Sequence, residues 1–83
     1  MSGTNKKYHS AIYDVGDILI LKNINNRIKT IIMIVDILPD FQFEDFGQDT
    51  YVIKYLQAPS DYFINHDYEI PCTMIEHNFI KIS

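Results

Sequence analysis

The longest apolar run, Lys29–Leu38 (KTIIMIVDIL), most constrains what this chain can fold into. Most of its apolar residues are β-branched, which makes their side chains stiff about χ1 and favours a strand over a helix. Ten residues is long for a strand but far too short for a helix that crosses a membrane. The run therefore predicts a central β-strand on which shorter strands pair.

Successive side chains of a strand point to opposite faces. In this strand both faces are rich in apolar residues. The odd-numbered face is entirely apolar and is expected to point into the core. Its residues are Ile31, Met33, Val35 and Ile37. The even-numbered face carries Ile32 and Ile34, which a small core cannot also cover completely. Either strong bending buries part of each face, or a second copy of the chain associates through Ile32 and Ile34.

Shorter apolar runs before and after the central strand predict four more strands. Gly16, which is able to take a positive φ, is expected in a turn that opens the first strand. Pro39 is expected to end the central strand, and Pro71 to mark an edge or a bulge. The other predicted strands are Ile18–Lys22, Tyr51–Leu56, Tyr68–Thr73 and Phe79–Ile82, with about one helical turn at Met74–Asn78.

The order of these features resembles the SH3-like small barrels, in the broad sense that includes Tudor and KOW-type modules. The matching stretches are Val15-Gly16-Asp17, the long second strand, Tyr51-Val52-Ile53, and Met74–Asn78 before Phe79-Ile80. The resemblance covers roughly residues 13–82 and implies an all-β fold. We expect a small five-stranded SH3-like barrel, or a strongly bent antiparallel sheet, with one short helical turn before the last strand. Residues 1–12 are expected to form a flexible N-terminal tail and residues 13–83 a single domain.

The net charge of −4 and the pI of about 5.1 disfavour binding to nucleic acid or to an anionic membrane, because both require basic patches. A single cysteine, Cys72, excludes an intramolecular disulfide and fits a reducing compartment. The N-terminal residues lack the apolar segment of a signal peptide. We therefore expect a cytoplasmic protein with no membrane partner.

No signature of catalysis or of metal binding appears in the sequence. Structural zinc sites use four ligands in closely paired spacings, whereas this chain offers Cys72 with the isolated His66 and His77. Cys72 is expected inside a strand beside Pro71, without a helix N-terminus to lower its pKa. The acidic residues between Asp36 and Asp49 lack the spacing of a calcium loop and the cleft that paired catalytic carboxylates need. The sequence predicts no enzyme, no metal and no cofactor.

The predicted binding site is a loop at residues 39–50, PDFQFEDFGQDT, in which aromatic and acidic residues alternate. At least one of Phe41, Phe43 and Phe46 is expected to project to solvent and anchor a protein partner. The acidic neighbours that would steer a basic partner surface are Asp40, Glu44, Asp45 and Asp49. The alternative is that these phenylalanines plug the open end of the barrel.

Together, these expectations describe a non-enzymatic binding module, and the expected partner is a protein. The alternative function is a barrel that binds single-stranded nucleic acid by stacking on tyrosines, for which the chain lacks a basic groove. The small size, the acidity and the abundance of Ile, Asn, Lys, Tyr and Phe resemble accessory proteins of large DNA phages or viruses. That resemblance implies a protein that modulates host machinery or forms part of a virion.

Overall fold

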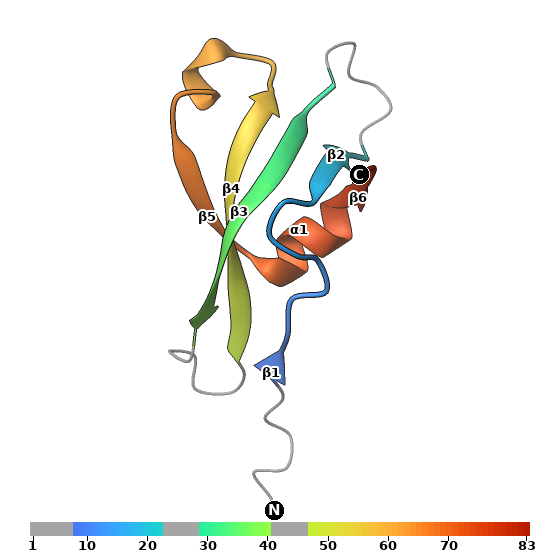
Figure 1. Ribbon diagram of the computed structural model, residues 1–83, viewed down its shortest axis with the longest axis vertical. Coiled ribbons are helices and arrows are strands. Elements are labelled where there is room, and N and C mark those ends of the chain that lie inside the picture. Colours follow the sequence, from blue (N-terminus) through green and yellow to red (C-terminus); the bar gives the residue numbers. More distant parts are fainter. Residues whose placement is uncertain (1–7, 23–28, 41–46) are drawn as a thin grey trace, which may run out of the picture.

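The computed structural model describes residues 8–22, 29–40 and 47–83, which form a curled, open, mixed β-sheet with one short α-helix (Figure 1). The expected all-β, barrel-like fold is therefore confirmed. The elements are β1 (Tyr8–His9), β2 (Ile18–Leu21), β3 (Ile31–Asp40), β4 (Gly47–Gln57), the 3₁₀ turn η1 (Asp61–Phe63), β5 (Asp67–Pro71), α1 (Cys72–Asn78) and β6 (Phe79–Lys81).

The long strand β3 lies in the middle of the sheet, between β4 and β2, as expected for the central apolar run. β6 pairs with the outer side of β2, whereas β5 pairs with the far side of β4 along residues 50–54. The short β1 runs parallel to β4 at Gly47 and Gln48, on the same side as β5. In Figure 1, β5, β4 and β3 form one wall, and α1 links β5 to the β2–β6 side. Within the described residues β5 and β6 do not pair, so the barrel stays open between them.

A β-bulge at Val35 explains why the predicted core face of the central strand is wrong. Ile34 is paired with Ile53, and the next pair is Asp36 with Val52, so Val35 is an extra residue on β3. Before the bulge, the even-numbered Ile32 and Ile34 point inward and are fully buried. After it, the odd-numbered Ile37 packs against the core. The strand therefore buries even-numbered residues before the bulge and an odd-numbered residue after it. This corresponds to the first of the two alternatives above, in which bending lets the strand bury part of each face.

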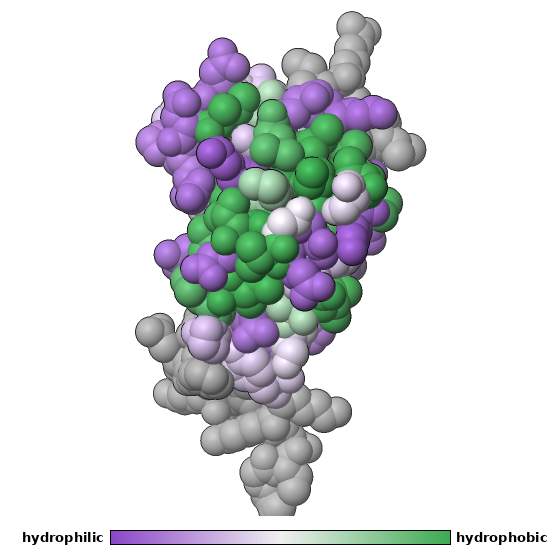
Figure 2. Space-filling model, viewed as in Figure 1, coloured by the Kyte–Doolittle hydropathy of each residue, from purple (hydrophilic) through white to green (hydrophobic). Residues whose placement is uncertain are grey.

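The surplus apolar residues lie on the outer face of the sheet. Ile32 and Ile34 are enclosed by their own chain, so they offer no surface to a second copy. The outer face instead carries the half-buried Ile18, Ile20, Met33, Val35 and Val52, together with Ile80. Ile80 is 50% exposed. In Figure 2 hydrophobic atoms gather over β3 and over the β2–β6 side of this face.

The loop between the two longest strands is shorter than the sequence predicted. Pro39 was expected to end β3, but the strand continues through Asp40. Among the described strands, only β4 pairs with the part of β3 that follows Ile34, and a strand with one open side tolerates proline. Because β4 already begins at Gly47, the connection is residues 41–46 rather than twelve residues, and it lies outside the described part of the chain.

Residues 8–12, which were assigned to a flexible tail, contact the sheet. β1 pairs with β4, and the backbone N–H groups of Ala11 and Ile12 donate hydrogen bonds to Asp49 and Tyr51. The turn before β2 is confirmed, since Gly16 has a φ of 96° and donates to the Ile34 carbonyl at 2.8 Å.

The C-terminal helix closes the core from one side. It begins at Cys72, two residues before the predicted helical turn, so Cys72 is on a helix and not in a strand. β5 ends at Pro71, two residues before the predicted end at Thr73, and among the described strands it pairs only with β4, so it is an edge strand, one of the two possibilities that Pro71 indicated. β6 follows the helix directly. The helix contributes Cys72 and Ile75 to a buried cluster. The complete cluster is Leu19, Ile32, Ile34, Tyr51, Ile53, Cys72, Ile75 and Phe79.

Candidate functional site

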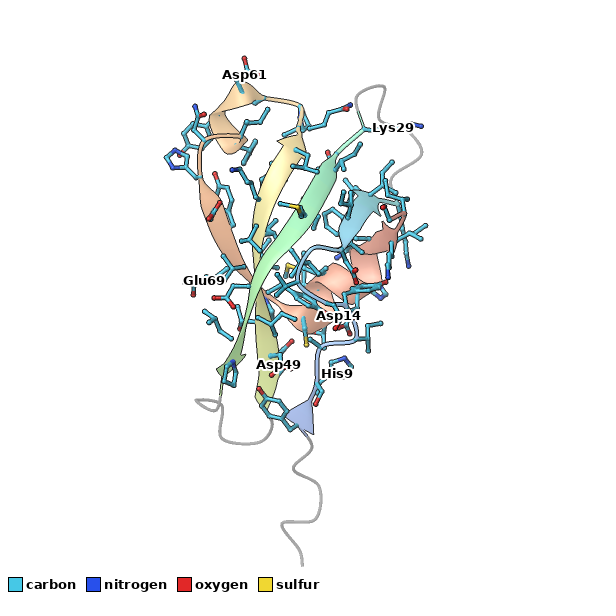
Figure 3. The ribbon with its side chains drawn as sticks, viewed as in Figure 1. His9, Asp14, Lys29, Asp49, Asp61 and Glu69 are labelled. Carbon is cyan, nitrogen blue, oxygen red and sulfur yellow. The ribbon has the colours of Figure 1, made fainter. Side chains whose placement is uncertain are left out.

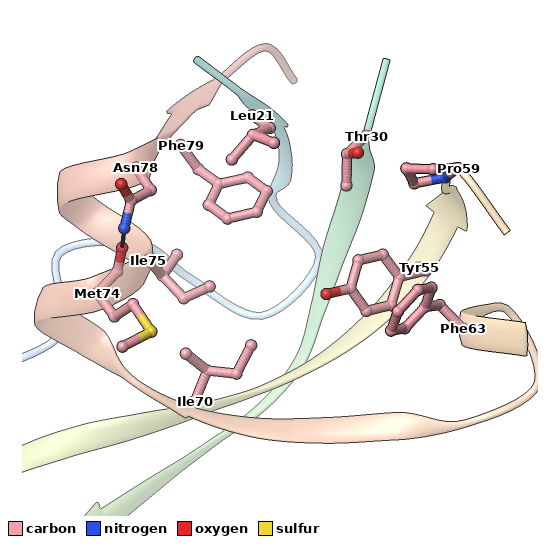
Figure 4. A pocket seen from close by; sticks show the side chains of 10 residues that line it. All are labelled: Leu21, Thr30, Tyr55, Pro59, Phe63, Ile70, Met74, Ile75, Asn78 and Phe79. Carbon is pink, nitrogen blue, oxygen red and sulfur yellow. Dashed lines mark hydrogen bonds between the residues drawn. The ribbon is translucent and has the colours of Figure 1, made fainter. Parts of the chain in front are cut away.

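An apolar pocket of about 360 Å³ opens where the curled sheet fails to close (Figure 4). This volume is at the lower end of the range typical of ligand sites. Residues from the wall of β4 and β5 face residues of α1, β6 and β2 across it. The lining residues are Leu21, Thr30, Tyr55, Pro59, Phe63, Ile70, Met74, Ile75, Asn78 and Phe79.

Aromatic packing fixes the sheet side of the pocket. The rings of Tyr55 and Phe63 lie 5.4 Å apart, and Tyr68 meets Tyr55 edge-on at the same distance. Phe63 is held by η1, whose start is capped by the Ser60 hydroxyl accepting from the Tyr62 N–H at 3.2 Å. The pocket wall is therefore built by a short, capped turn and not by a loose connection.

The helix side combines buried floor residues with an exposed rim. Ile75 and Phe79 belong to the core, whereas the Met74 side chain is 56% exposed at the mouth. Methionine is flexible and polarisable, which lets it adapt to irregular apolar surfaces. The nearby Asn78 amide is occupied by a hydrogen bond to the Met74 carbonyl at 2.8 Å.

The lining of this pocket is mostly apolar. Burial raises the pKa of the Tyr55 hydroxyl, and the neighbouring Tyr68 adds to the shift. The phenol therefore stays protonated at neutral pH. The lining holds no carboxylate, histidine, lysine or cysteine, so the residues described around it include no general acid–base pair. What the pocket offers is apolar surface beside a few hydrogen-bonding groups.

A second, polar cluster lies at the other end of the sheet, where β1 meets β4 and α1. His9 Nε2 and Glu76 Oε1 are 2.7 Å apart, and the Tyr51 hydroxyl donates to Glu76 Oε2 at 2.6 Å. The Cys72 thiol is 3.5 Å from the His9 carbonyl oxygen and 3.7 Å from Gln48 Oε1. Figure 3 shows His9 and Asp49 together at this end, far from Lys29 and Asp61.

Cys72 is a buried thiol and not an activated nucleophile. Burial raises its pKa to about 11, and the carboxylates of Glu76 and Asp49 act in the same direction. A nucleophilic cysteine requires the opposite shift, since the thiolate is the reactive form. His66 and His77 are exposed, and Cys72 is buried.

We expect the native Cys72 thiol to react with iodoacetamide at pH 7.5 at least about 30-fold more slowly than the same thiol in urea, in buffer with chelator. Both its zero exposure and its raised pKa reduce the reactive fraction. Mass spectrometry of the alkylated chain over time measures the two rates. Equal rates would show that the thiol is accessible.

Most residues of the predicted acidic aromatic site lie outside the described part of the chain. These are Phe41, Phe43, Glu44, Asp45 and Phe46. Asp40 is the last residue of β3. Asp49 is not a free surface charge, because its carboxylate accepts hydrogen bonds from the Tyr8 hydroxyl and from the Ala11 N–H.

The sequence analysis predicted neither the pocket nor the contacts of His9 with Glu76 and Cys72. The pocket depends on which strands fail to pair, and no local pattern encodes that. His9 is separated from Cys72 by more than sixty residues, as the 63-residue spacing of their hydrogen bond shows. The available signal was the spacing of Cys72 and Glu76, which places both on one face of a helix.

Comparison with protein-family models, with curated proteins and with solved structures finds no match for this chain. Within the described residues, no helix has the length and apolar character required to cross a membrane.

Proposed function

We propose that this chain is a non-enzymatic module that binds a protein by receiving an apolar side chain or short apolar segment in the pocket between β4–β5 and α1–β6. The observation that carries the proposal is the pocket itself, which is apolar, aromatic and open to the surface. Buried aromatic anchors in such pockets supply most of the binding energy in protein interfaces.

The composition of the pocket mouth supports a protein partner. Besides Met74, the exposed apolar residues near η1 and the end of β4 include Tyr62 at 69% and Leu56 at 44% exposure. Methionine and tyrosine are enriched at protein interfaces, where they combine apolar area with adaptability. The Tyr62 ring lies 5.5 Å from that of the lining residue Phe63, so exposed apolar surface continues beyond the pocket and suits a ligand larger than it.

The distribution of charge disfavours the alternative, a module that binds single-stranded nucleic acid. Nucleic-acid binders align several cations along the backbone of their ligand. In the part of the chain that the structure describes, the cations are Lys22, Lys29, Lys54 and Lys81. Lys81 is 3.4 Å from the Asp17 carboxylate, and Lys54 is paired in register with Asp67. No continuous basic stripe is formed by these described residues.

The acidic aromatic segment at residues 41–46 remains a predicted second contact with the same class of partner. The described residues that flank it, Asp40 and Gly47, lie at the ends of β3 and β4 away from the pocket, since Tyr55 follows Gly47 by most of the length of β4. The resemblance to SH3-like barrels, and a role as a phage or viral accessory protein, remain proposals from sequence.

The test compares two variants of the chain, each with a carboxylate introduced on a different apolar surface. Met74→Glu places a carboxylate at the pocket rim, whereas Ile80→Glu places one on the outer face, where a similar fraction of the side chain is exposed. We expect the partner captured from the native source to bind Ile80→Glu as it binds the unmodified chain. Its affinity for Met74→Glu should fall at least about 30-fold, the loss typical of a central interface residue.

The control is thermal unfolding of both variants, which should match the parent because both sites are exposed. Equal capture by the two variants would remove the pocket from the proposal. Retention of nucleic acid, with loss of signal after nuclease treatment, would favour the alternative function.

A further inference from the structure

We propose that His9, Cys72 and Glu76 form a binding site for one divalent transition-metal ion of the zinc class. One ligand atom from each residue, an imidazole nitrogen, a thiol sulfur and a carboxylate oxygen, lies within 4.8 Å of the other two. The three residues come from β1 and from two adjacent turns of α1. This site lies apart from the pocket residues and does not depend on the proposed protein-binding function.

The type of donor atoms selects the class of ion. Zinc accepts sulfur, nitrogen and oxygen ligands together, whereas calcium and magnesium require oxygen donors alone. A thiolate and a carboxylate carry two negative charges, which balance a divalent cation when the imidazole is neutral.

The spacing of the donors fits coordination after a small movement. Zinc bonds of roughly 2.0–2.3 Å in a tetrahedron separate the donor atoms by about 3.5 Å. The present separations, at most 4.8 Å among the three and 2.7 Å between His9 Nε2 and Glu76 Oε1, bracket that value. Shifts of about 1 Å in side chains would therefore complete the geometry, and the thiol proton would leave to solvent.

A supporting layer of hydrogen bonds already orients the carboxylate. Glu76 Oε2 accepts from the Tyr51 hydroxyl at 2.6 Å and from the Ile12 N–H at 3.1 Å, which leaves Oε1 directed at His9. Such secondary hydrogen bonds typify metal sites and raise their affinity. The His9 side chain is 48% exposed, so a fourth position can be filled by water.

Metal binding would link β1, near the N-terminus, to α1, near the C-terminus. The ion would tie β1, whose ladder with β4 consists of the pairs Tyr8–Gly47 and His9–Gln48, to the first turns of α1. Binding to the folded chain alone would raise its unfolding temperature by mass action.

The experiment titrates the full chain, freed of metal by chelator, with Zn²⁺ by calorimetry and with Co²⁺ by absorption spectroscopy. We expect one ion per chain, a sulfur-to-cobalt charge-transfer band and a higher unfolding temperature with Zn²⁺. The variants His9→Gln and Cys72→Ala should each lose at least tenfold in affinity. His77→Gln, an exposed histidine next to Glu76 in sequence, is the matched control and should bind as the parent does.

Equal Zn²⁺ affinity in His9→Gln and the parent, no uptake by the parent, or a Co²⁺ spectrum without the charge-transfer band would overturn the proposal. His9 is half exposed, so its replacement tests the site even if Cys72→Ala does not fold. None of these outcomes changes the Met74→Glu result, because Met74 lines the pocket and belongs to no part of the cluster.

Discussion

Replacing Ile34 with alanine is expected to lower the free energy of unfolding by about 3–4 kcal/mol, a large share of the stability of a domain of this size. Ile34 is fully buried and is paired with the equally buried Ile53. Truncation leaves a cavity that the sheet cannot close, because the backbone on both sides is held by ladder hydrogen bonds. Urea unfolding followed by circular dichroism measures the change.

The neighbouring Val35→Ala is the matched control. Val35 lies in the bulge and on the outer face, with its side chain half-buried, so its loss should cost about 1 kcal/mol or less. The two variants therefore test directly which of the two adjacent side chains points into the core. A larger loss for Val35 than for Ile34 would contradict the bulge and restore the face that the sequence predicted.

This pair of residues also shows how far the fold can be read from the sequence. The strand propensity of the run containing them, its central place in the sheet and the short strands around it all followed from local patterns. The direction of its side chains did not, because one inserted residue reverses the alternation and both parities are apolar. Nothing in IIMIVDIL indicates which residue bulges, since that depends on the pairing with β4.

The candidate sites were less predictable than the fold for a related reason. The pocket exists because β5 and β6 do not meet, a consequence of global curvature that no single segment determines. The polar cluster combines residues from the two ends of the chain, and β1 has only two residues, too few to show a pattern. By contrast, the missing N–H of proline indicated an edge or a bulge at Pro71, and the strand that ends there is an edge strand of the described sheet.

The second large effect is expected at Tyr51, whose hydroxyl joins three parts of the molecule. It accepts hydrogen bonds from the N–H groups of Ile12 and Tyr13, each at 3.0 Å, and donates to the Glu76 carboxylate at 2.6 Å. Burial, followed by the bond to Glu76, raises the pKa of this phenol well above its ordinary value. It therefore remains a donor at every physiological pH.

Tyr51→Phe keeps the buried ring, and its packing 6.3 Å from the Tyr13 ring, while removing all three hydrogen bonds. We expect a loss of about 2–4 kcal/mol in unfolding free energy, because the Tyr13 N–H and the Glu76 carboxylate lose a partner away from bulk water. Tyr62→Phe, on an exposed ring, should change stability by less than about 0.5 kcal/mol.

A further measurement separates this anchoring role from a general loss of packing. In Tyr51→Phe the amide hydrogens of Ile12 and Tyr13 should exchange faster relative to those of β3, since local opening of residues 8–13 no longer breaks the bonds to the phenol. If exchange instead accelerates uniformly over the sheet, the hydroxyl contributes to global stability without anchoring the N-terminal segment. Because Glu76 is also the proposed metal ligand, Zn²⁺ should partly restore the slow exchange in Tyr51→Phe by fixing His9 to α1 through the ion.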